Sequence, residues 1–260
     1  MPSPIELLLD PVSLAVLALY GTLITWEAVA PARTLPSVRG WKLMGLAAFT
    51  AMFFVSSYLP LLWTEQLSQF QLFDLTGLGT WGGALVGVLV YEFGVYVWHR
   101  TMHSSNTLWR VFHQMHHSAE RVDAYGAFWF SPADMIGWTV LYSLALTLVV
   151  GITAEATTVV LLVTTLLAVF QHTNVRTPQW LGYIVQRPES HSYHHERGVH
   201  ARNYSDLPVF DMIFGTFYNP RAFAPATGFY DGASARIIDM LLARDVSVPH
   251  PDAAPTARAA

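Results

Sequence analysis

Five long apolar runs alternate with polar segments along the chain. They cover Pro11 to Ala30, Leu43 to Trp63, Trp81 to Trp98, Met135 to Gly151 and Ala156 to Phe170. A helix that crosses a bilayer needs about 20 such residues, so the first three runs are long enough to span. The last two are shorter and almost continuous, which predicts a tight hairpin that either crosses and returns or re-enters from one side.

This pattern predicts an all-α, multi-span integral membrane protein with a histidine-rich helical cap. We expect residues 1–80 to form N-terminal membrane helices and residues 81–220 to form the domain that carries the histidines. Residues 221–260 read as a C-terminal tail that is partly disordered, because the segment from Val246 onward is rich in Pro and Ala.

Composition agrees with a membrane protein. Only 12% of the residues are charged, 53% are hydrophobic, and the mean hydropathy is +0.35. The net charge of −4 makes nucleic acid an unexpected partner. The chain has no cysteine, which excludes disulfides, thiolate-bound haem, iron–sulfur clusters and cysteine nucleophiles within it. Imidazole is therefore the only plentiful ligand for a transition metal.

The positions of the cationic residues predict the topology. All 14 Lys and Arg residues fall within 31–42, 99–134 and 172–260, and none lies in 1–10 or 64–80. The positive-inside rule therefore puts the N-terminus outside and every histidine cluster at the cytoplasmic face. No removable signal peptide is expected at the N-terminus, because no cationic residue precedes the first apolar run.

Three histidine clusters have the spacing of metal ligands. They are His99-x-x-x-His103, His113-x-x-His116-His117 and His191-x-x-His194-His195, and His172 follows the fifth apolar run. Residues three or four apart share one face of a helix, so each cluster is expected to aim its imidazoles at one point. One four-coordinate ion needs only three or four protein ligands, so these nine histidines indicate two metal ions.

Two further polar residues near the clusters leave alternatives open. His200 is a tenth ligand, a group that supports the ligands, or a surface residue. Glu92 lies in the third apolar run on one helical stripe with Tyr96, His99 and His103. It either accepts a hydrogen bond from a ligand imidazole or is protonated and bonded to a neighbouring helix. His250, in the tail, is not expected to be a ligand.

The segment from Arg121 to Asp134 is rich in aromatic residues. It reads as an interfacial anchor, because aromatic residues collect at headgroup depth, or as a wall of the lipid entrance. On the second interpretation, the residues expected to line the substrate path are Tyr96, Tyr125, Phe128 and Trp129.

These motifs, with Gln171-His172-Thr173-Asn174 between them, resemble the fatty acid hydroxylase/sterol desaturase superfamily of membrane di-iron enzymes. The resemblance covers about residues 85–220 and includes a closing segment, Asn203-Tyr204 followed by Phe210-Asp211 and Phe214-Gly215-Thr216. It implies two iron ions, O₂ as oxidant, and hydroxylation or desaturation of a lipid, fatty-acyl or sterol-like substrate. It also implies that Asn203 and Asp211 support the ligands from behind.

The chain departs from that family at one position, since Arg176 stands where members carry a second histidine near His172. Electrons are expected from a separate donor protein, because the chain has neither a dinucleotide-binding glycine motif nor cysteine ligands. Arginines near the histidines are expected either to dock an acidic donor or to hold anionic lipid headgroups: Arg110, Arg121, Arg187, Arg197 and Arg202. Zinc is expected to occupy the iron sites in some purified samples.

Two other functions compete with a lipid oxygenase. One is a zinc-binding membrane hydrolase, suggested by His195-Glu196 with His200 downstream. That spacing is five residues, whereas the helical zinc-protease site needs four. The other is a non-catalytic metal-binding or transport protein. A transporter places its ligands near the membrane midplane, whereas these clusters lie outside the apolar runs.

Overall fold

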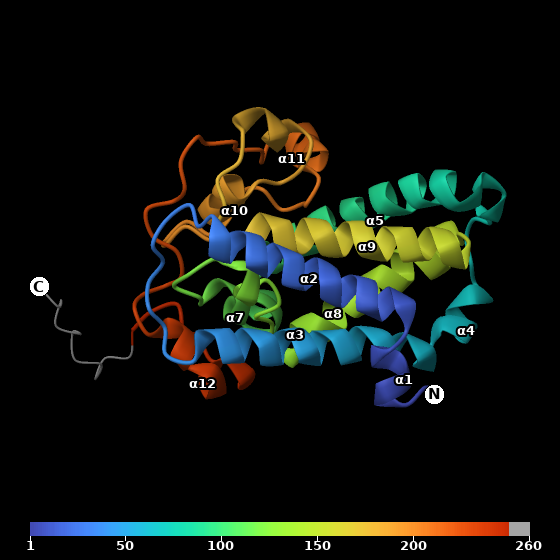
Figure 1. Cartoon of the computed structure of the whole chain (residues 1–260), viewed down its shortest axis with the longest axis horizontal. Coiled ribbons are helices and arrows are strands. Elements are labelled where there is room, and N and C mark those ends of the chain that lie inside the picture. Colours follow the sequence, from blue (N-terminus) through green and yellow to red (C-terminus); the bar gives the residue numbers. More distant parts are fainter. Residues whose placement is uncertain (250–260) are drawn as a thin grey trace, which may run out of the picture.

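The computed structural model describes residues 1–249 as helices joined by loops, without a strand in that range (Figure 1). The long α-helices are α2 (Pro11–Val29), α3 (Trp41–Tyr58), α5 (Gly79–Ser104), α8 (Pro132–Ser143) and α9 (Ala154–His172). Two π-helical segments, η3 (Trp109–His113) and η5 (Leu144–Val150), continue α6 and α8. The shorter α-helices are α1 (Pro4–Leu8), α4 (Thr64–Ser68), α6 (Asn106–Leu108), α7 (Gln114–His117), α10 (Pro188–His194), α11 (Pro208–Phe214) and α12 (Ile237–Leu241). Short 3₁₀ helices are η1 (Leu59–Leu62), η2 (Thr76–Leu78), η4 (Ala124–Gly126), η6 (Gln179–Tyr183) and η7 (Ala233–Ala235).

The five predicted apolar runs are confirmed as five helical segments long and apolar enough to cross a membrane. The last two, Pro132–Val150 and Ala154–His172, have 19 residues each, as many as the first. They are longer than the sequence suggested because each begins at a capping side chain. Ser131 accepts a hydrogen bond from the backbone N–H of Asp134, and Thr153 accepts one from that of Ala156. Both therefore have spanning length, and a short re-entrant pair is not needed to explain them.

Helices α5 and α9 lie side by side through the bundle (Figure 1). Small residues on α5 allow this approach: a Cβ atom added at Gly87 would lie only 2.8 Å from a methyl carbon of Val160. Helix α5 also continues past the end of its apolar run to Ser104, so His99 and His103 lie on its last two turns. The contact between α5 and α9 thereby fixes the position of the helix that carries His99 and His103.

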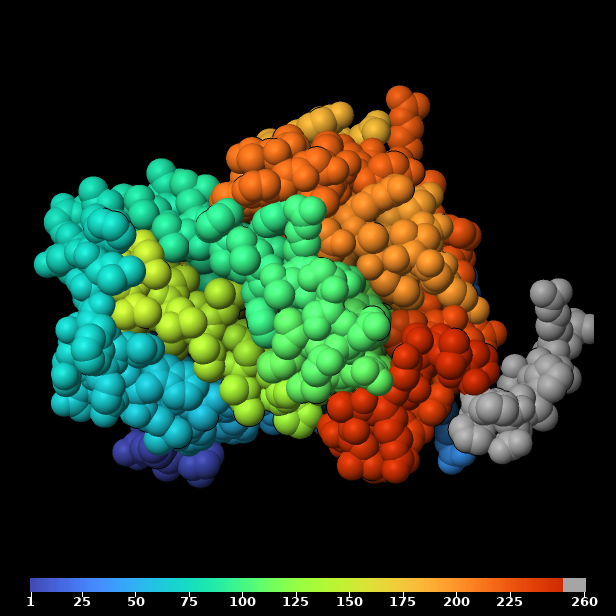
Figure 2. Space-filling view, turned by 180° about the vertical axis from the view of Figure 1, so that it is seen from behind, coloured from blue at the N-terminus to red at the C-terminus, as the bar shows by residue number. Residues whose placement is uncertain are grey.

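The segments that follow the spans form a cap at one end of the bundle. Figure 1 shows α7, α10 and α12 at this end and α1 and α4 at the other. In Figure 2 the green segment around residues 100–115, the orange segment around 200–215 and the red segment near the C-terminus lie side by side over it. The predicted histidine-rich helical cap is therefore present.

The prediction that the chain is disordered from Val246 onward is wrong for Val246 itself. This side chain is fully buried in a core cluster with Trp41, Trp129 and Met240. Its backbone N–H donates to the Oε1 of Gln114, 3.3 Å away. Burial of an apolar side chain offsets the entropy cost of ordering the chain here. Residues 250–260 of that segment, including His250, lie outside the described residues.

Candidate metal centre

The nine histidines predicted as ligands come together in two adjoining groups under the cap. The first group, called group A, has one ring nitrogen from each of five histidines, all within 4.8 Å of one another: His99, His103, His113, His117 and His194. The second, group B, gathers four in the same way: His116, His172, His191 and His195. The groups are neighbours, because His117 of group A stacks on His195 of group B with ring centroids 4.2 Å apart.

Each His-x-x-His-His motif is divided between the two groups, so the expectation that one motif aims at one point is wrong. His113 and His117 belong to group A, whereas His116 belongs to group B. In the second motif the division is reversed: His191 and His195 belong to group B and His194 to group A. At 3.6 residues per turn, positions i+3 and i+4 lie about 100° apart around the helix, on opposite sides of position i. One short helix can therefore serve two neighbouring ions.

Backbone carbonyls fix the orientation of three group A imidazoles. The Nδ1 atoms of His99, His103 and His194 lie 2.8, 2.9 and 2.6 Å from the carbonyl oxygens of Tyr204, His200 and Arg202. A carbonyl oxygen only accepts, so each Nδ1 carries the hydrogen and each neutral ring presents a bare lone pair at Nε2. The Nε2 atoms of His103 and His194 are buried and have no hydrogen-bond partner. Such tautomers are those of imidazoles prepared to bind a metal through Nε2.

A carboxylate orients the fourth imidazole of group A. The Nδ1 of His113 lies 2.9 Å from the Oδ2 of Asp134, which is completely buried at the start of α8. With Asp134 ionised, His113 also presents a bare lone pair at Nε2, 2.9 Å from the Nε2 of His99. Two lone pairs that face each other this closely repel, and a cation between them removes the repulsion. Sequence reasoning missed Asp134, although Ser131 three residues earlier marks it as part of a helix cap.

The spacing within group B also suits a metal ion. The Nε2 of His172 lies 3.1 Å from that of His116 and 2.9 Å from that of His191, and the Nε2 of His195 lies 3.1 Å from that of His191. Ligands at about 90° around an ion with ~2.1 Å bonds lie ~3.0 Å apart, whereas tetrahedral ligands lie ~3.4 Å apart. These three distances are closer to the spacing of ligands at about 90° than to that of tetrahedral ligands.

Burial keeps the imidazoles in the neutral form that binds metal. The side chains of His116, His191 and His195 are almost completely inaccessible to solvent. Loss of hydration lowers the pKa of each well below its ordinary value, and the neighbouring imidazoles lower it further. These groups are consequently unprotonated at neutral pH.

The loop that supplies the three carbonyls is strained and held from behind. His200, Arg202 and Asn203 have positive φ angles of 43°, 71° and 50°, which non-glycine residues rarely adopt. The side-chain amide of Asn203 donates to the carbonyls of Ser190 and Tyr218. Tertiary contacts of this kind are what such backbone conformations need in order to persist.

Asp211 holds the end of the same loop. Its carboxylate accepts hydrogen bonds from the backbone N–H groups of Tyr204 and Ser205 at 2.8 and 3.0 Å. The Tyr204 carbonyl that receives His99 is thereby fixed in place. Both residues that the resemblance implied as supports, Asn203 and Asp211, are in contact with the loop that orients the histidines.

The remaining polar candidates take different positions. His200 lies outside both groups, and its Nδ1 is 3.0 Å from the Nδ1 of His117. Of the three positions considered for His200, this contact fits that of a group that supports a ligand. Of the two alternatives for Glu92, the hydrogen bond to a ligand imidazole is not formed. Glu92 instead accepts from the hydroxyl of Ser205 and the backbone N–H of Asp206, at 3.0 and 3.1 Å. This occurs because α5 turns that residue toward the loop after Tyr204.

One of the predicted donor-docking arginines is not available to a partner. Arg187 is 1% exposed and pairs with Glu189 at 3.0 Å just before α10. Glu189 also accepts hydrogen bonds from the backbone and hydroxyl of Thr177. This buried network anchors the first turn of α10, which carries His191 and His194.

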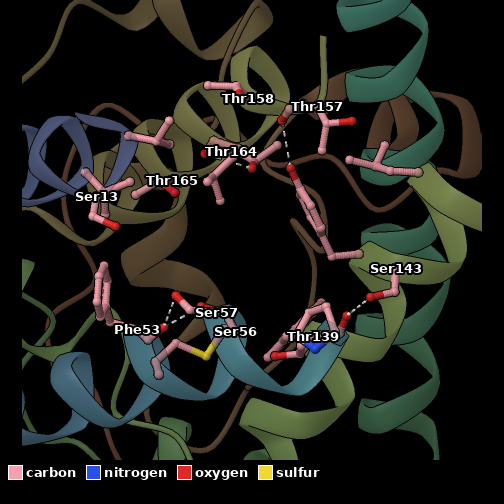
Figure 3. A pocket seen from close by; sticks show the side chains of 18 of the residues that line it. Ser13, Phe53, Ser56, Ser57, Thr139, Ser143, Thr157, Thr158, Thr164 and Thr165 are labelled. Carbon is pink, nitrogen blue, oxygen red and sulfur yellow. Dashed lines mark hydrogen bonds between the residues drawn. The ribbon is translucent and has the colours of Figure 1, made fainter. Parts of the chain in front are cut away.

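A cavity of about 490 Å³ lies between the spanning helices (Figure 3). Ser13, Ser56, Thr139 and Thr164 are among the side chains that surround it in Figure 3. Most hydroxyls of the wall bond to carbonyls of their own helix, as Thr164 does to Val160. Its volume falls within the range of pockets that bind small ligands.

One end of this cavity lies next to the histidine groups. Trp138 lines it, and the indole ring is 5.9 Å from the ring of His99 between centroids. Ala168 also lines it, and its carbonyl accepts from the Nδ1 of His172 at 2.6 Å. Residues near the other end of the bundle, such as Asp10 and Thr64, line the same cavity. An elongated molecule in this space has one part beside the histidines.

The four residues predicted to line the substrate path separate into two pairs. Phe128 lines the cavity in Figure 3, and Tyr125 lines a second cavity nearer the 31–42 loop. Tyr96 and Trp129 are each 3% exposed, are packed inside the protein and line neither cavity. Tyr96 stacks on Phe214, and Trp129 packs against Trp41.

Comparison with known proteins gives consistent matches. The model of the family described as fatty acid hydroxylase matches residues 84–216. The chain is 32% identical over 146 residues to an ornithine lipid hydroxylase, OlsE, of Rhizobium tropici, a match that covers 52% of this chain and 42% of that protein. It is 33% identical over 142 residues to the alkylglycerol monooxygenase of Homo sapiens, covering 53% of this chain and 30% of that protein. The chain thus spans less than half the length of either relative. No solved structure matches it significantly.

Proposed function

Because the chain belongs to the fatty acid hydroxylase family, we propose that it is a multi-pass membrane oxygenase that holds two iron ions and uses O₂ to hydroxylate or desaturate a lipid. Its histidine groups contain five and four ring nitrogens and lie side by side. The observation that carries the proposal is the state of the buried Nε2 atoms of His103 and His194. Each ring donates its hydrogen from Nδ1 to a carbonyl oxygen, so its Nε2 atom has a bare lone pair. Those atoms have no other use within the described structure.

When bound, two iron ions would supply the redox chemistry needed to activate O₂ and oxidise a C–H bond. Hydroxylation puts one oxygen atom of O₂ into the C–H bond, and two electrons and two protons convert the other atom into water. Desaturation removes two hydrogen atoms from the chain and converts both oxygen atoms into water with the same two electrons and two protons. The electrons come from a separate donor protein, since the chain has no cysteine ligand or dinucleotide motif.

The residues of the chain orient the imidazoles and exclude water from the site. Tyr204, His200 and Arg202 hold three imidazoles through their carbonyls, and Asp134 holds a fourth. Such supporting contacts fix the ring orientation of metal-binding histidines and raise their basicity. The burial of His99, His113 and His194, with His103 partly buried, keeps bulk water away from a reactive centre.

The substrate is proposed to be a lipid whose apolar part occupies the cavity in Figure 3. The two relatives are named for their action on an ornithine lipid and on alkylglycerols, both of which are lipids with a polar end. A site at the end of spanning helices can receive such a molecule from the bilayer without full transfer into water. The distribution of Lys and Arg supports a cytoplasmic metal centre and an N-terminus outside.

The zinc hydrolase fits the site less well. A catalytic zinc site normally has three protein ligands and an open position, whereas group A gathers five imidazoles. Transport of metal ions is also disfavoured, because His172 and His103 lie within the last turn or two of their spanning helices rather than at midplane.

The test is expression of the full chain in a host that lacks it, followed by mass spectrometry of the lipid extract. The proposal predicts a lipid that gains the mass of one oxygen atom or loses that of two hydrogen atoms. It also predicts that this change disappears in His113→Ala while the variant still accumulates in the membrane. An unchanged lipid profile in cells that contain the iron-loaded protein and a working electron donor contradicts the proposal.

A further inference from the structure

A second cavity lies at the same end of the bundle as the histidines, outside the metal centre. Its volume is about 530 Å³, and it is bounded by the end of α2, the 31–42 loop, the start of α3 and the loop before α8. The polar side chains among its lining residues are Glu27, Arg33, Thr34, Lys42, Arg121, Tyr125 and Asn174.

The charges of this cavity are predominantly positive. Lys42 is the only lysine of the chain, and neither Lys42 nor Arg33 forms a salt bridge within residues 1–249. Burial lowers the pKa of Arg33 to about 10, so its guanidinium remains charged at neutral pH. The Oε2 of Glu27, the one carboxylate of the lining, accepts from the backbone N–H groups of Ala124 and Asn174. The lining therefore holds three cationic side chains and one carboxylate, and two of the cations, Arg33 and Lys42, have no carboxylate partner within residues 1–249.

Two buried polar atoms of the lining have no partner. They are the Nε of Arg33, a donor, and the Oδ1 of Asn174, an acceptor. Asn174 is only 3% exposed, and its amide nitrogen already donates to the carbonyl of Arg33. Unpaired buried polar atoms cost free energy, so a ligand with an anionic group and a hydrogen-bond donor would stabilise this arrangement.

The cavity is connected to group B by short structural links. Asn174 follows His172 by two residues, and its carbonyl accepts from the backbone N–H of Ala32 at 2.7 Å. Arg33 donates to the carbonyl of Ala224, whose own N–H donates to the hydroxyl of Ser192 beside His191. A group bound by Arg33 therefore lies at the depth of the metal centre, where the spanning helices α2 and α9 end.

The two cavities also follow the same helices. On α3, Lys42 lines the second cavity and Phe49 lines the first. On α2, Ile24 lines the second cavity and Val16 lines the first. Seven or eight residues of helix correspond to about 10–12 Å. The separation of the two cavities along these helices is therefore short enough for the two ends of one amphiphilic molecule to span.

We propose that the cavity of Arg33, Lys42 and Asn174 binds the anionic phosphate of the lipid substrate's headgroup. This inference rests on the proposed function, because it assigns the polar end of the same substrate. A lipid is favoured over a free anion because apolar residues of α2, Ile24 and Ala28, form part of the wall. Membrane headgroups occupy this depth, where cationic side chains attract anionic lipids.

The single lysine permits a direct test that requires no turnover. The purified full chain in neutral detergent is treated with an amine-reactive reagent, and labelling of Lys42 and of the N-terminal amine is followed by mass spectrometry. Phosphatidic acid is compared with diacylglycerol of the same chains and with inorganic phosphate. With phosphatidic acid at about ten times its Kd, labelling of Lys42 should slow about tenfold, while the N-terminal amine is unaffected.

Matched variants then test the residues. Arg33→Gln should abolish the protection, whereas Arg39→Gln, in the same loop but outside the cavity lining, should retain it. Equal labelling with phosphatidic acid and diacylglycerol on the unchanged chain overturns the proposal without relying on any variant. Protection by inorganic phosphate alone at the same concentration also overturns it, because the site would then take a free anion. Since no oxidation is measured, failure here is distinct from failure of the oxygenase proposal.

Discussion

Asp134 and His113 are joined by a buried hydrogen bond of 2.9 Å between Oδ2 and Nδ1. Asp134 comes from a spanning helix and His113 from the π-helical segment that precedes α7. The bond thus ties the orientation of a proposed metal ligand to the membrane bundle. Carboxylate–imidazole pairs of this kind strengthen the ligand and fix its tautomer.

Replacement of Asp134 therefore tests the support of the ligands. Asp134→Asn should lower metal affinity about 10–100-fold, because the imidazole loses its charged acceptor. Affinity is measured by competition with a chelator of known strength. Glu92→Gln is the matched control, since it also replaces a buried acid but that acid contacts Ser205 and Asp206 rather than an imidazole. An equal loss of metal in both variants would contradict the assignment of these two acids.

His116 and His117 are adjacent but belong to different groups, so single substitutions should remove the metal ion from one group at a time. His117→Ala removes a nitrogen from group A, and His116→Ala removes one from group B. Each variant should lose mainly one ion, so the metal content falls from about two toward one per chain, as elemental analysis would show. A set of variants in which every single substitution removes all metal, or none, would contradict the division into two groups.

The metal-free protein should become less stable as the pH falls below the ordinary histidine pKa of about 6.5. Burial lowers the pKa of His116, His191 and His195 well below that value, and that of His200 to about 4. The unfolded chain therefore binds protons that the folded chain excludes. Stability is full above pH about 6.5 and is lost progressively on acidification. Thermal unfolding in detergent between pH 8 and pH 5 should show a falling Tm, and a Tm that rises toward pH 5 would disagree.

Filling the apolar cavity should affect the substrate without affecting the metal. Leu161 lines the cavity, whereas Leu166, on the same helix α9, is 42% exposed on the outer surface of the bundle. Leu161→Trp should therefore reduce lipid oxidation strongly at unchanged metal content, and Leu166→Trp should leave both unchanged. If the two variants behave alike, the substrate does not occupy this cavity.

The predicted membrane topology rests on the positions of Lys and Arg, so it can be tested without measuring metal binding or lipid oxidation. Reporter fusions at residues 1–10 and 64–80 should report an outside location, and fusions after the 31–42 loop a cytoplasmic one. A cytoplasmic result for both of the first two segments would place the histidines on the opposite face.

The sequence predicted the spans and the nine histidines because both depend on local patterns. Hydrophobic length indicates a span, and spacing of three or four residues brings imidazoles close on one helix. The distribution of His116 and His117 between two groups depends on which neighbours each side of the helix meets, and spacing does not contain that information. Val246 was misread for a similar reason, since its burial depends on Trp41 and Met240, far away in the chain.

The supporting shell was harder to predict because it joins distant segments. Asp134 lies in a stretch dominated by aromatic residues, and only its place three residues after Ser131 distinguishes it. The carbonyls of His200, Arg202 and Tyr204 leave no trace in side-chain patterns at all. Glu92 shares a helical stripe with His99, but the packing of the loop after Tyr204 against α5 decides its actual partner.

The central claim is that two adjoining histidine groups hold two iron ions. Its most direct test is elemental analysis of the chain purified without oxygen from iron-supplied cells, combined with X-ray absorption at the iron edge. We predict close to two iron ions per chain, each surrounded mainly by imidazole nitrogen. A reproducible value of one ion per chain, or iron without imidazole ligands, would contradict it.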